Sequence, residues 1–316
     1  MEEVPKATLI LLLSGVLTGV IFGFTLQHSR YCMNAAFRDV ILIKDFTWFR
    51  AWLLALLVAI IGANLIEDLG ILEDTLRRQA FAPVAAIIGG YLFGAGVVIT
   101  GGCGSGILCR QGEGQFGAVV AILGFVAGII TTLHGLLNPA LTFLRSFKVP
   151  IGDEYTPALW DLLGIEGMKW MVIGVVAAVI IPVVLKGKPF GKGSRKGWSW
   201  SLGGFLVGLI VVWAWWASNY WGGQPRGLSF IGPTSDLFMF ILTGSSNAPF
   251  DPMFNIFGIG IATWSALYIV GVPIGSYLSA KGLKECKLTA PREPQELVRF
   301  FFGGLVMGIG GALAGG

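Results

Sequence analysis

Residues 89–102 of the chain read GGYLFGAGVVITGG, and residues 303–316 read GGLVMGIGGALAGG. The six glycines of the first stretch recur in the second at one constant offset of 214 residues, as Gly89 and Gly303 illustrate. Both stretches lie in apolar segments long enough to enter a bilayer. We therefore expect two related halves that meet face to face, with these glycines at the junction.

The composition indicates the class of protein. Hydrophobic residues make up 54% of the 316 residues, charged residues only 13%, and there are 47 glycines. These proportions favour an all-α polytopic membrane protein and argue against a soluble domain. The apolar stretch after the acidic start MEEVPK has no small-residue cleavage site, so we expect a retained first span and no signal peptide.

Windows of about 20 apolar residues predict about eight membrane spans. They cover residues 7–27, 50–66, 81–100, 116–136, 168–186, 198–217, 253–280 and 298–316. A re-entrant segment among the glycine-rich stretches would change this number by one.

Basic residues in the short loops predict the orientation. The loop 186–196 holds five basic and no acidic residues, and the loop 281–287 is also basic, so both should be cytoplasmic. The acidic segment 137–167 should be external. Counting backwards, the loop with Arg30, Arg38, Lys44 and Arg50 falls inside, and the N-terminus falls outside. The expected location is the cell inner (cytoplasmic) membrane.

Two further matches point to an internal repeat of opposite orientation. Residues 15–31 align with 204–220, and residues 61–65 align with 274–278. Since the first member of each pair runs in the opposite direction from the second, we expect an inverted-topology repeat with broken or re-entrant glycine-rich helices. The alternative is that the glycines form ordinary helix-packing ladders.

The predicted organisation has three parts. Residues 1–136 hold the first repeat and the span after it; residues 137–197 hold an external loop, a connecting span and a basic cytoplasmic linker; and residues 198–316 hold a second repeat, expected to be incomplete at its C-terminal end.

The densest candidate site is residues 101–106, GGCGSG, with four glycines in six positions. Such a run interrupts a helix and leaves backbone amides free to bind an anion. A short helix starting at Ile107 would point its positive end at the same place, with Cys103 at the focus. The alternative is a flexible turn in which Cys103 is a small apolar filler.

A second candidate is the polar segment 27–34, QHSRYCMN, followed by Arg38 and Asp39. Polar groups after an apolar run need a wet cavity or a membrane surface. The segment is therefore either part of a substrate path or a cytoplasmic loop. The second half carries Trp221 where the first carries Cys32, so the two halves are not chemically equivalent here.

The strings RYCMNAAFRD (30–39) and GGCGSGILCRQGEG (101–114) resemble the paired signatures of the YeeE/YedE family of bacterial membrane proteins, which includes thiosulfate-uptake proteins. The resemblance covers essentially the whole chain. It implies an inverted-repeat helical fold and uptake of a small sulfur-containing anion, typically thiosulfate, past a line of cysteines.

The resemblance also implies site residues. Cys32 and Cys103 match two family cysteines, with Gly102, Gly104 and Ser105 beside the second. The third would fall at position 317, so either the chain continues in the native protein or this site is absent. Cys109 lies in the motif but not at its defining position, and Cys286 does not match. Supporting candidates are Asn34, Arg38, Cys109, Arg110, Glu113 and Gln115, the last three shaping an exit or bracing the short helix.

Physical chemistry makes a cysteine path reasonable for a dianion with a soft sulfur. Thiols are weak donors, and weak binding allows release. The thiols should be neutral, because a thiolate would repel the anion, and apolar surroundings favour the neutral form. Alternatives are a membrane sulfurtransferase or thiol-redox enzyme that forms a cysteine persulfide, a selenium-compound transporter, or a scaffold that transports nothing.

Partners and cofactors follow from the same sequence. No phosphate-binding ATPase loop, disulfide framework or metal knuckle is recognisable, so we expect no cofactor, no metal and no catalytic residues. Nucleic acid is not an expected partner, whereas the lipid bilayer is. The resemblance implies a cytoplasmic TusA-like sulfur carrier protein, which the basic loops could attract.

Overall fold

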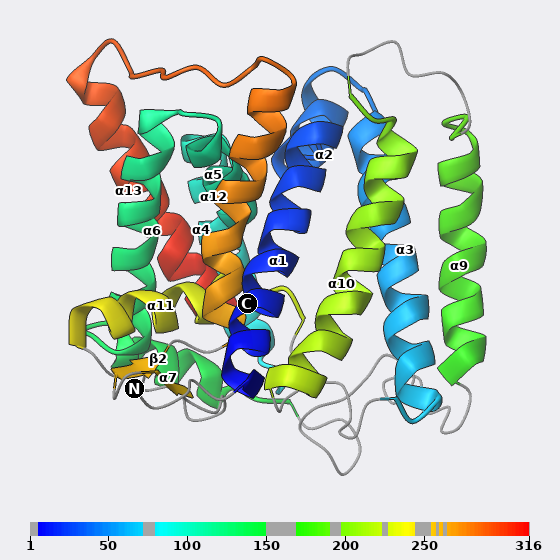
Figure 1. Cartoon of the computed structure of the whole chain (residues 1–316), viewed down its shortest axis with the longest axis horizontal. Helices are drawn as coiled ribbons and strands as arrows, with labels where there is room; N and C mark the ends of the chain where they lie inside the picture. The colour runs from blue at the N-terminus through cyan, green and yellow to red at the C-terminus, as the bar shows by residue number, and fades with distance from the viewer. Residues whose placement is uncertain are drawn as a thin grey trace.

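A computed structural model describes residues 6–71, 80–149, 169–189, 197–222, 227–243, 254–256, 259–261 and 264–315 (Figure 1). The helices in these ranges are α1 (Lys6–Ser29), α2 (Met33–Leu42), α3 (Thr47–Asp68), α4 (Pro83–Thr100), α5 (Gly104–Gly112), α6 (Phe116–Leu133), α7 (Asn138–Ser146), α9 (Lys169–Leu185), α10 (Trp200–Gly222), α11 (Gly232–Thr243), α12 (Trp264–Gly282) and α13 (Pro294–Ala314). Two short antiparallel strands, β1 (Phe254–Ile256) and β2 (Ile259–Ile261), form a hairpin.

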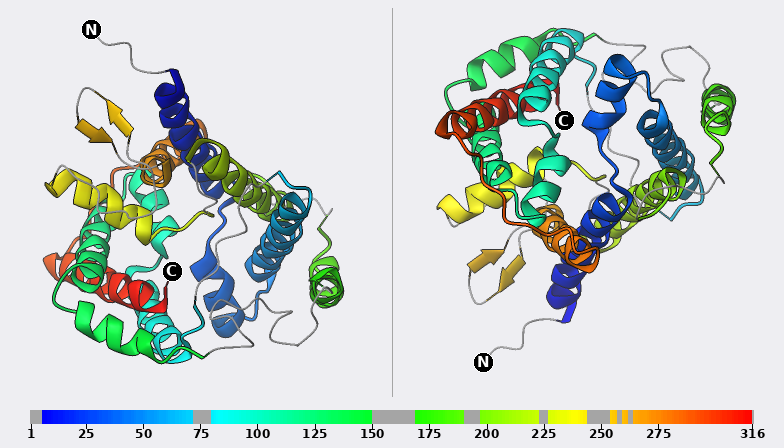
Figure 2. Two further views of the ribbon diagram at one scale, coloured as in Figure 1. Left: turned by 90° about the horizontal axis from the view of Figure 1, so that it is seen from below. Right: turned by 90° about the horizontal axis from the view of Figure 1, so that it is seen from above.

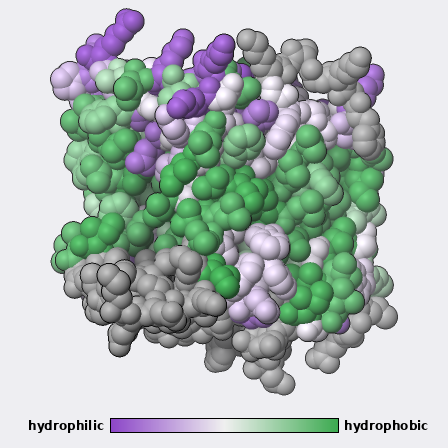
Figure 3. Space-filling view, viewed as in Figure 1, coloured by the Kyte–Doolittle hydropathy of each residue, from purple (hydrophilic) through white to green (hydrophobic). Residues whose placement is uncertain are grey.

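The prediction of an all-α polytopic membrane protein is confirmed, apart from the small hairpin. Five helical segments of the described residues are long and apolar enough to cross a membrane, among them Pro83–Gly112, which joins α4 and α5. An apolar band covers the middle height of the face in Figure 3, and hydrophilic residues gather along its upper edge. Each of the eight predicted spans overlaps a described helix.

Helices from the two halves of the chain pair with each other. Helix α1 packs along α12, and α10 packs along α3. In Figure 1, α1 and α12 run upward, whereas α3 and α10 run downward. Gly19 lies against Tyr268 and Gly271 of α12, and its counterpart Gly208 lies against Ala55 and Val58 of α3. The first helix of each half thus contacts the third helix of the other, which supports the inverted-repeat arrangement.

The repeated glycine ladder forms the contact between α4 and α13, which run antiparallel. A Cβ at Gly96 would lie 2.5 Å from the backbone nitrogen of Met307. A Cβ at Gly310 would meet the backbone nitrogen of Phe93 in the same way. The two contacts are equivalent under the 214-residue offset, because Gly96 corresponds to Gly310 and Phe93 to Met307. Glycine is needed here because the helix backbones touch.

Several predicted boundaries were wrong. The predicted span 253–280 begins too early, because residues 254–256 and 259–261 form strands and the helix starts at Trp264. Part of the expected external loop is helical, since it contains α7. The expected inner loop between the first two spans contains α2. Residues 150–168, which hold the acidic positions of the expected external loop, lie outside the described residues.

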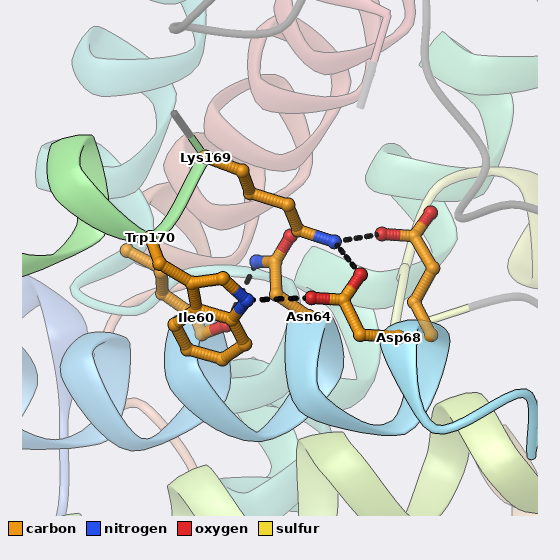
Figure 4. A network of polar contacts seen from close by, with 6 residues as sticks. Ile60, Asn64, Asp68, Lys169 and Trp170 are labelled. Atoms are coloured by element: carbon orange, nitrogen blue, oxygen red, sulfur yellow. Dashed lines mark hydrogen bonds and ion pairs between the residues drawn. The ribbon is translucent and has the colours of Figure 1, made fainter. Parts of the chain in front are cut away.

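Helix α9 lies at the edge of the bundle beside α3, as both views of Figure 2 show. The Lys169 ammonium contacts the carboxylates of Glu67 at 2.6 Å and Asp68 at 2.8 Å. The indole N–H of Trp170 donates to Asp68 at 2.7 Å (Figure 4). These contacts attach the start of α9 to the end of α3.

One end of the bundle carries the connections from α2 to α3, α9 to α10 and α12 to α13 (Figure 1). We call it the basic end, because its described residues include Lys44, Lys186, Lys188, Lys281, Lys284 and Lys287. Glu67 and Asp68 lie at the opposite end, where α3 finishes. The basic loops that were predicted to share one side therefore do so.

Candidate functional site

The glycine run 101–106 interrupts one long membrane-crossing segment. Helix α4 ends at Thr100, and Gly101 adopts the left-handed conformation with φ of 71°. Cys103 is extended (φ −76°, ψ −179°) and is the N-cap of α5. The predicted short helix exists, but it starts at Gly104 and not at Ile107, because one extended residue is enough to begin a new helix after the left-handed turn.

Cys103 is buried within the main apolar core, with only 6% of its surface exposed. Its sulfur lies 3.3 Å from the hydroxyl oxygen of Ser105. The backbone N–H groups of Ser105 and Gly106 also face this sulfur, although they do not form a regular capping bond. Gly104 is buried against Phe230 and Phe125. The thiol thus sits at the positive end of a short helix, beside one hydroxyl and close to aromatic rings.

The other family motif forms a second interruption with the same local geometry. Helix α1 continues to Ser29, two residues beyond the predicted span 7–27, and Arg30 then adopts φ of 56°. Cys32 is extended and is the N-cap of α2. Both Cys32 and Cys103 therefore follow a left-handed residue by two positions and begin a short helix.

The two interruptions lie close together. Cys32, Cys103 and the side chain of Tyr31 are near enough to interact electrostatically. Cys32 is partly exposed, whereas Cys103 is buried. All four cysteines, including Cys286, are unpaired thiols. The two sequence motifs, separated by 71 positions, thus converge on one place in the fold.

Cys109 makes a different kind of contact. Its sulfur lies 3.2 Å from the hydroxyl oxygen of Ser276 on α12, and that hydroxyl donates to the Cys109 backbone oxygen at 2.7 Å. Since the single hydroxyl hydrogen is used, the Cys109 thiol is the donor to Ser276. Nearby, Gly112 packs directly against the Pro273 carbonyl. This geometry favours a brace between α5 and α12.

The candidates Arg110, Glu113 and Gln115 lie in the last turn of α5 and in the turn that follows it. The Arg110 guanidinium folds back over the interruption, since a Cβ at Gly101 would lie 2.9 Å from its Nη1. The Gln115 amide donates to the Glu113 carboxylate at 3.1 Å. Burial raises the pKa of the Glu113 carboxyl, and the charge of Arg110 partly opposes this rise. The connection after α12 pairs with this turn, because Thr289 bonds to both Gly114 and Phe116.

The remaining candidates of the first motif lie on α2. Asn34 is buried, and Arg38 pairs with the adjacent Asp39 at 2.8 Å. This pair is local to α2, so the geometry gives Arg38 no contact with either cysteine.

Sequence reasoning missed a polar cluster that ties the first interruption to the end of α12. Glu285 pairs with Arg30, and the Gln27 amide lies 3.5 Å from the same carboxylate. Ser279 donates to Gln27 at 2.6 Å, and the His28 ring lies 3.1 Å from the Ser279 hydroxyl. The available signal in the sequence was charge: Arg30 of the first motif is basic, and the charged segment 284–287 contains an acidic residue, Glu285.

A bundle of apolar helices, in which five segments of the described residues are long enough to cross a bilayer, defines a polytopic membrane protein. The chain belongs to the sulphur-transport family, whose sequence profile matches residues 28–316. This family assignment agrees with the resemblance found in the two motifs.

Two curated relatives cover nearly the whole chain. The thiosulfate transporter TsuA of Spirochaeta thermophila is 31% identical over 311 residues, which is 96% of this chain and 88% of the relative. The thiosulfate transporter TsuA of Escherichia coli is 28% identical over 315 residues, or 97% of this chain and 85% of the relative. The probable transporter YedE of Escherichia coli is 34% identical over 100 residues, or 32% of this chain and 24% of the relative.

Proposed function

We propose that this protein takes up thiosulfate, or a closely related small sulfur-containing anion, across the cytoplasmic membrane along a path that passes Cys32 and Cys103. The observation that carries the proposal is that Cys32 and Cys103, each at the start of a short helix, lie near enough to interact electrostatically. The sulphur-transport family and the names of the two full-length relatives support the choice of cargo.

The surroundings of Cys103 suit a neutral hydrogen-bonding thiol. The sulfur is buried among apolar side chains, and within the described ranges its side-chain hydrogen-bond partner is the Ser105 hydroxyl. No cation of the described residues acts on this thiol, so a thiolate would be an unpaired buried charge, which is costly. Together with Gly102 and Gly104, whose backbones need no side-chain room, these groups can replace part of the water around an anion.

The transport direction and partner are parts of the same proposal. The basic end faces the cytoplasm under the positive-inside rule, which leaves the N-terminus external. The first repeat (1–136) and the second (198–316) then form two inverted halves joined by residues 137–197. A cytoplasmic TusA-like carrier that accepts the cargo would meet the lysines of the basic end.

Uptake by proteoliposomes tests the proposal. Wild-type protein should accumulate [35S]thiosulfate above empty liposomes, and Cys103→Ala should abolish uptake while expression and monodispersity stay unchanged. Cys286→Ala is the matched control, because Cys286 lies in the charged connection after α12 and should be silent. Near-normal uptake by Cys103→Ala would remove this thiol from the mechanism, and absent flux in the wild type would contradict transport itself.

Cys32 has its own comparison. Cys32→Ser should impair uptake less than Cys32→Ala, because a hydroxyl still donates a hydrogen bond. A fully active Cys32→Ala protein would refute the assignment of Cys32 to the path. A stable persulfide on Cys103 after exposure to thiosulfate, detected by mass spectrometry, would favour the sulfurtransferase alternative.

A further inference from the structure

A cavity of about 200 Å³ lies between the α4–α5 interruption and the basic end. Its inner wall includes Thr100 and Ile107, on either side of the interruption that carries Cys103. Its outer wall includes Thr289 and the exposed Glu296 at the start of α13. The cavity therefore extends from residues that flank the interruption carrying Cys103 to the exposed start of α13.

Arg110 is the cationic side chain in the wall of this cavity. Its guanidinium is held over Gly101, where the absence of a side chain leaves the room it occupies. Within the described part of the chain, no carboxylate lies within ion-pair distance of it and no oxygen accepts a hydrogen bond from it. Glu113, which interacts with it through space, already accepts a hydrogen bond from Gln115.

A half-buried guanidinium with unused donors suits an oxyanion, because charge-assisted hydrogen bonds to such groups are strong and directional. The second N–H of the Gln115 amide and the Thr289 hydroxyl, both in the cavity wall, can add donors. The Thr100 hydroxyl cannot, because it donates to the backbone oxygens of its own helix and of Gly102. The volume leaves room for one small oxyanion and a few waters, since a water takes about 30 Å³.

We propose that this cavity is a second anion-binding station, where Arg110 holds a tetrahedral sulfur oxyanion after it leaves the Cys103 site. The inference rests on the proposed function, and it assigns to Arg110 direct contact with the cargo. Glu296 stands at the outer opening with the opposite charge, so it weakens binding there and favours release.

Equilibrium binding of [35S]thiosulfate to the purified protein tests the station directly. The Cys103→Ala protein, which lacks the buried thiol, serves as background, and the dependence of its remaining saturable binding on Arg110 assigns that binding to the cavity. In this background Arg110→Gln should weaken binding at least about tenfold, since hydrogen bonds to charged groups are lost. Glu296→Gln should strengthen binding several-fold. Arg299→Gln, which removes an exposed charge from the same end of α13 without touching the cavity, should change binding less than twofold.

Three results would overturn the station. The first is that the Cys103→Ala protein shows no saturable binding. The second is that adding Arg110→Gln leaves the affinity within twofold of that background. The third is that Arg299→Gln weakens binding as much as Arg110→Gln, which would make the effect one of surface charge. If Arg110→Gln fails to fold, Arg110→Lys replaces it, because lysine keeps the charge. Glu296→Gln still decides, because stronger binding supports the station and weaker binding contradicts it. Arg110-dependent binding without any uptake by liposomes would refute transport and leave the station in place. Uptake without an effect of Arg110 on binding would refute the station and leave transport in place.

Discussion

Gly101 and Gly315 end their helices in the same way, 214 positions apart. Both adopt the left-handed conformation, with φ of 71° after α4 and 88° after α13. The two helices run antiparallel against each other through their glycine ladders, and α13 finishes near the middle height of the bundle (Figure 1). The shared ending supports a common structural role for the two ladders: each delivers a helix end to the interior.

Gly101→Ala should destabilise the protein and reduce uptake. A left-handed alanine costs about 1–2 kcal/mol, and the new methyl group would also meet the Arg110 guanidinium. Thermal unfolding of the purified protein measures the loss. Gly102→Ala is the matched control for stability, because its Cβ would find ordinary contacts at 3.4 Å or more and no positive φ is required. Equal stability of the two variants would contradict the prediction.

Gly96→Ala and Gly94→Ala form a matched pair within α4. A Cβ at Gly96 would meet the backbone and Cβ of Met307 at 2.5–2.6 Å, so the substitution should cost about 1–3 kcal/mol. A Cβ at Gly94 would have nothing within 4 Å, and alanine is the better helix former, so that variant should be neutral or slightly stabilised. Comparable melting temperatures for both would show that α4 and α13 are not in backbone contact.

Cys109→Ala should lower stability by about 1 kcal/mol, because the thiol donates to Ser276 across the contact of α5 with α12. Uptake should persist at a temperature where the variant is folded. Ser276→Ala should show a similar loss of stability, and Cys286→Ala should show none. If Cys109→Ala were fully stable and inactive, the thiol would belong to the substrate path and not to a brace.

Glu113 should make the stability of the protein depend on pH. Burial raises the pKa of this carboxyl in the folded state, so its favourable contribution is present below the unfolded pKa of about 4.3. That contribution is lost as the pH rises through the higher folded value, where the buried group must ionise. Glu113→Gln should therefore raise the melting temperature at pH 8 and change it little at pH 4. Glu293→Gln, at an exposed position, is the control for removing one negative charge. If Glu113→Gln raised the melting temperature more at pH 4 than at pH 8, the predicted pH dependence would be wrong.

Local patterns were enough to predict the class of protein and the main interruption. Runs of about 20 apolar residues predict helices wherever water is absent, because the backbone must satisfy its own hydrogen bonds. Gly101 and Gly102 after such a run predict the end of a helix, and the structure has that end beside Cys103. The strands at 254–256 and 259–261 were missed, since a glycine-interrupted apolar run looks the same as the start of a span.

The sequence by itself determined that this chain enters a membrane as glycine-rich helices and that one helix ends at the glycine run before Cys103, because these properties depend on composition and on neighbouring residues. Only the tertiary structure decided that Cys32 and Cys103 lie close together and that Glu285 joins Arg30. It also placed Arg110 over Gly101 in the wall of a cavity. These relationships join residues far apart in the chain, and they follow from the packing of one helix backbone against another, which no local pattern records.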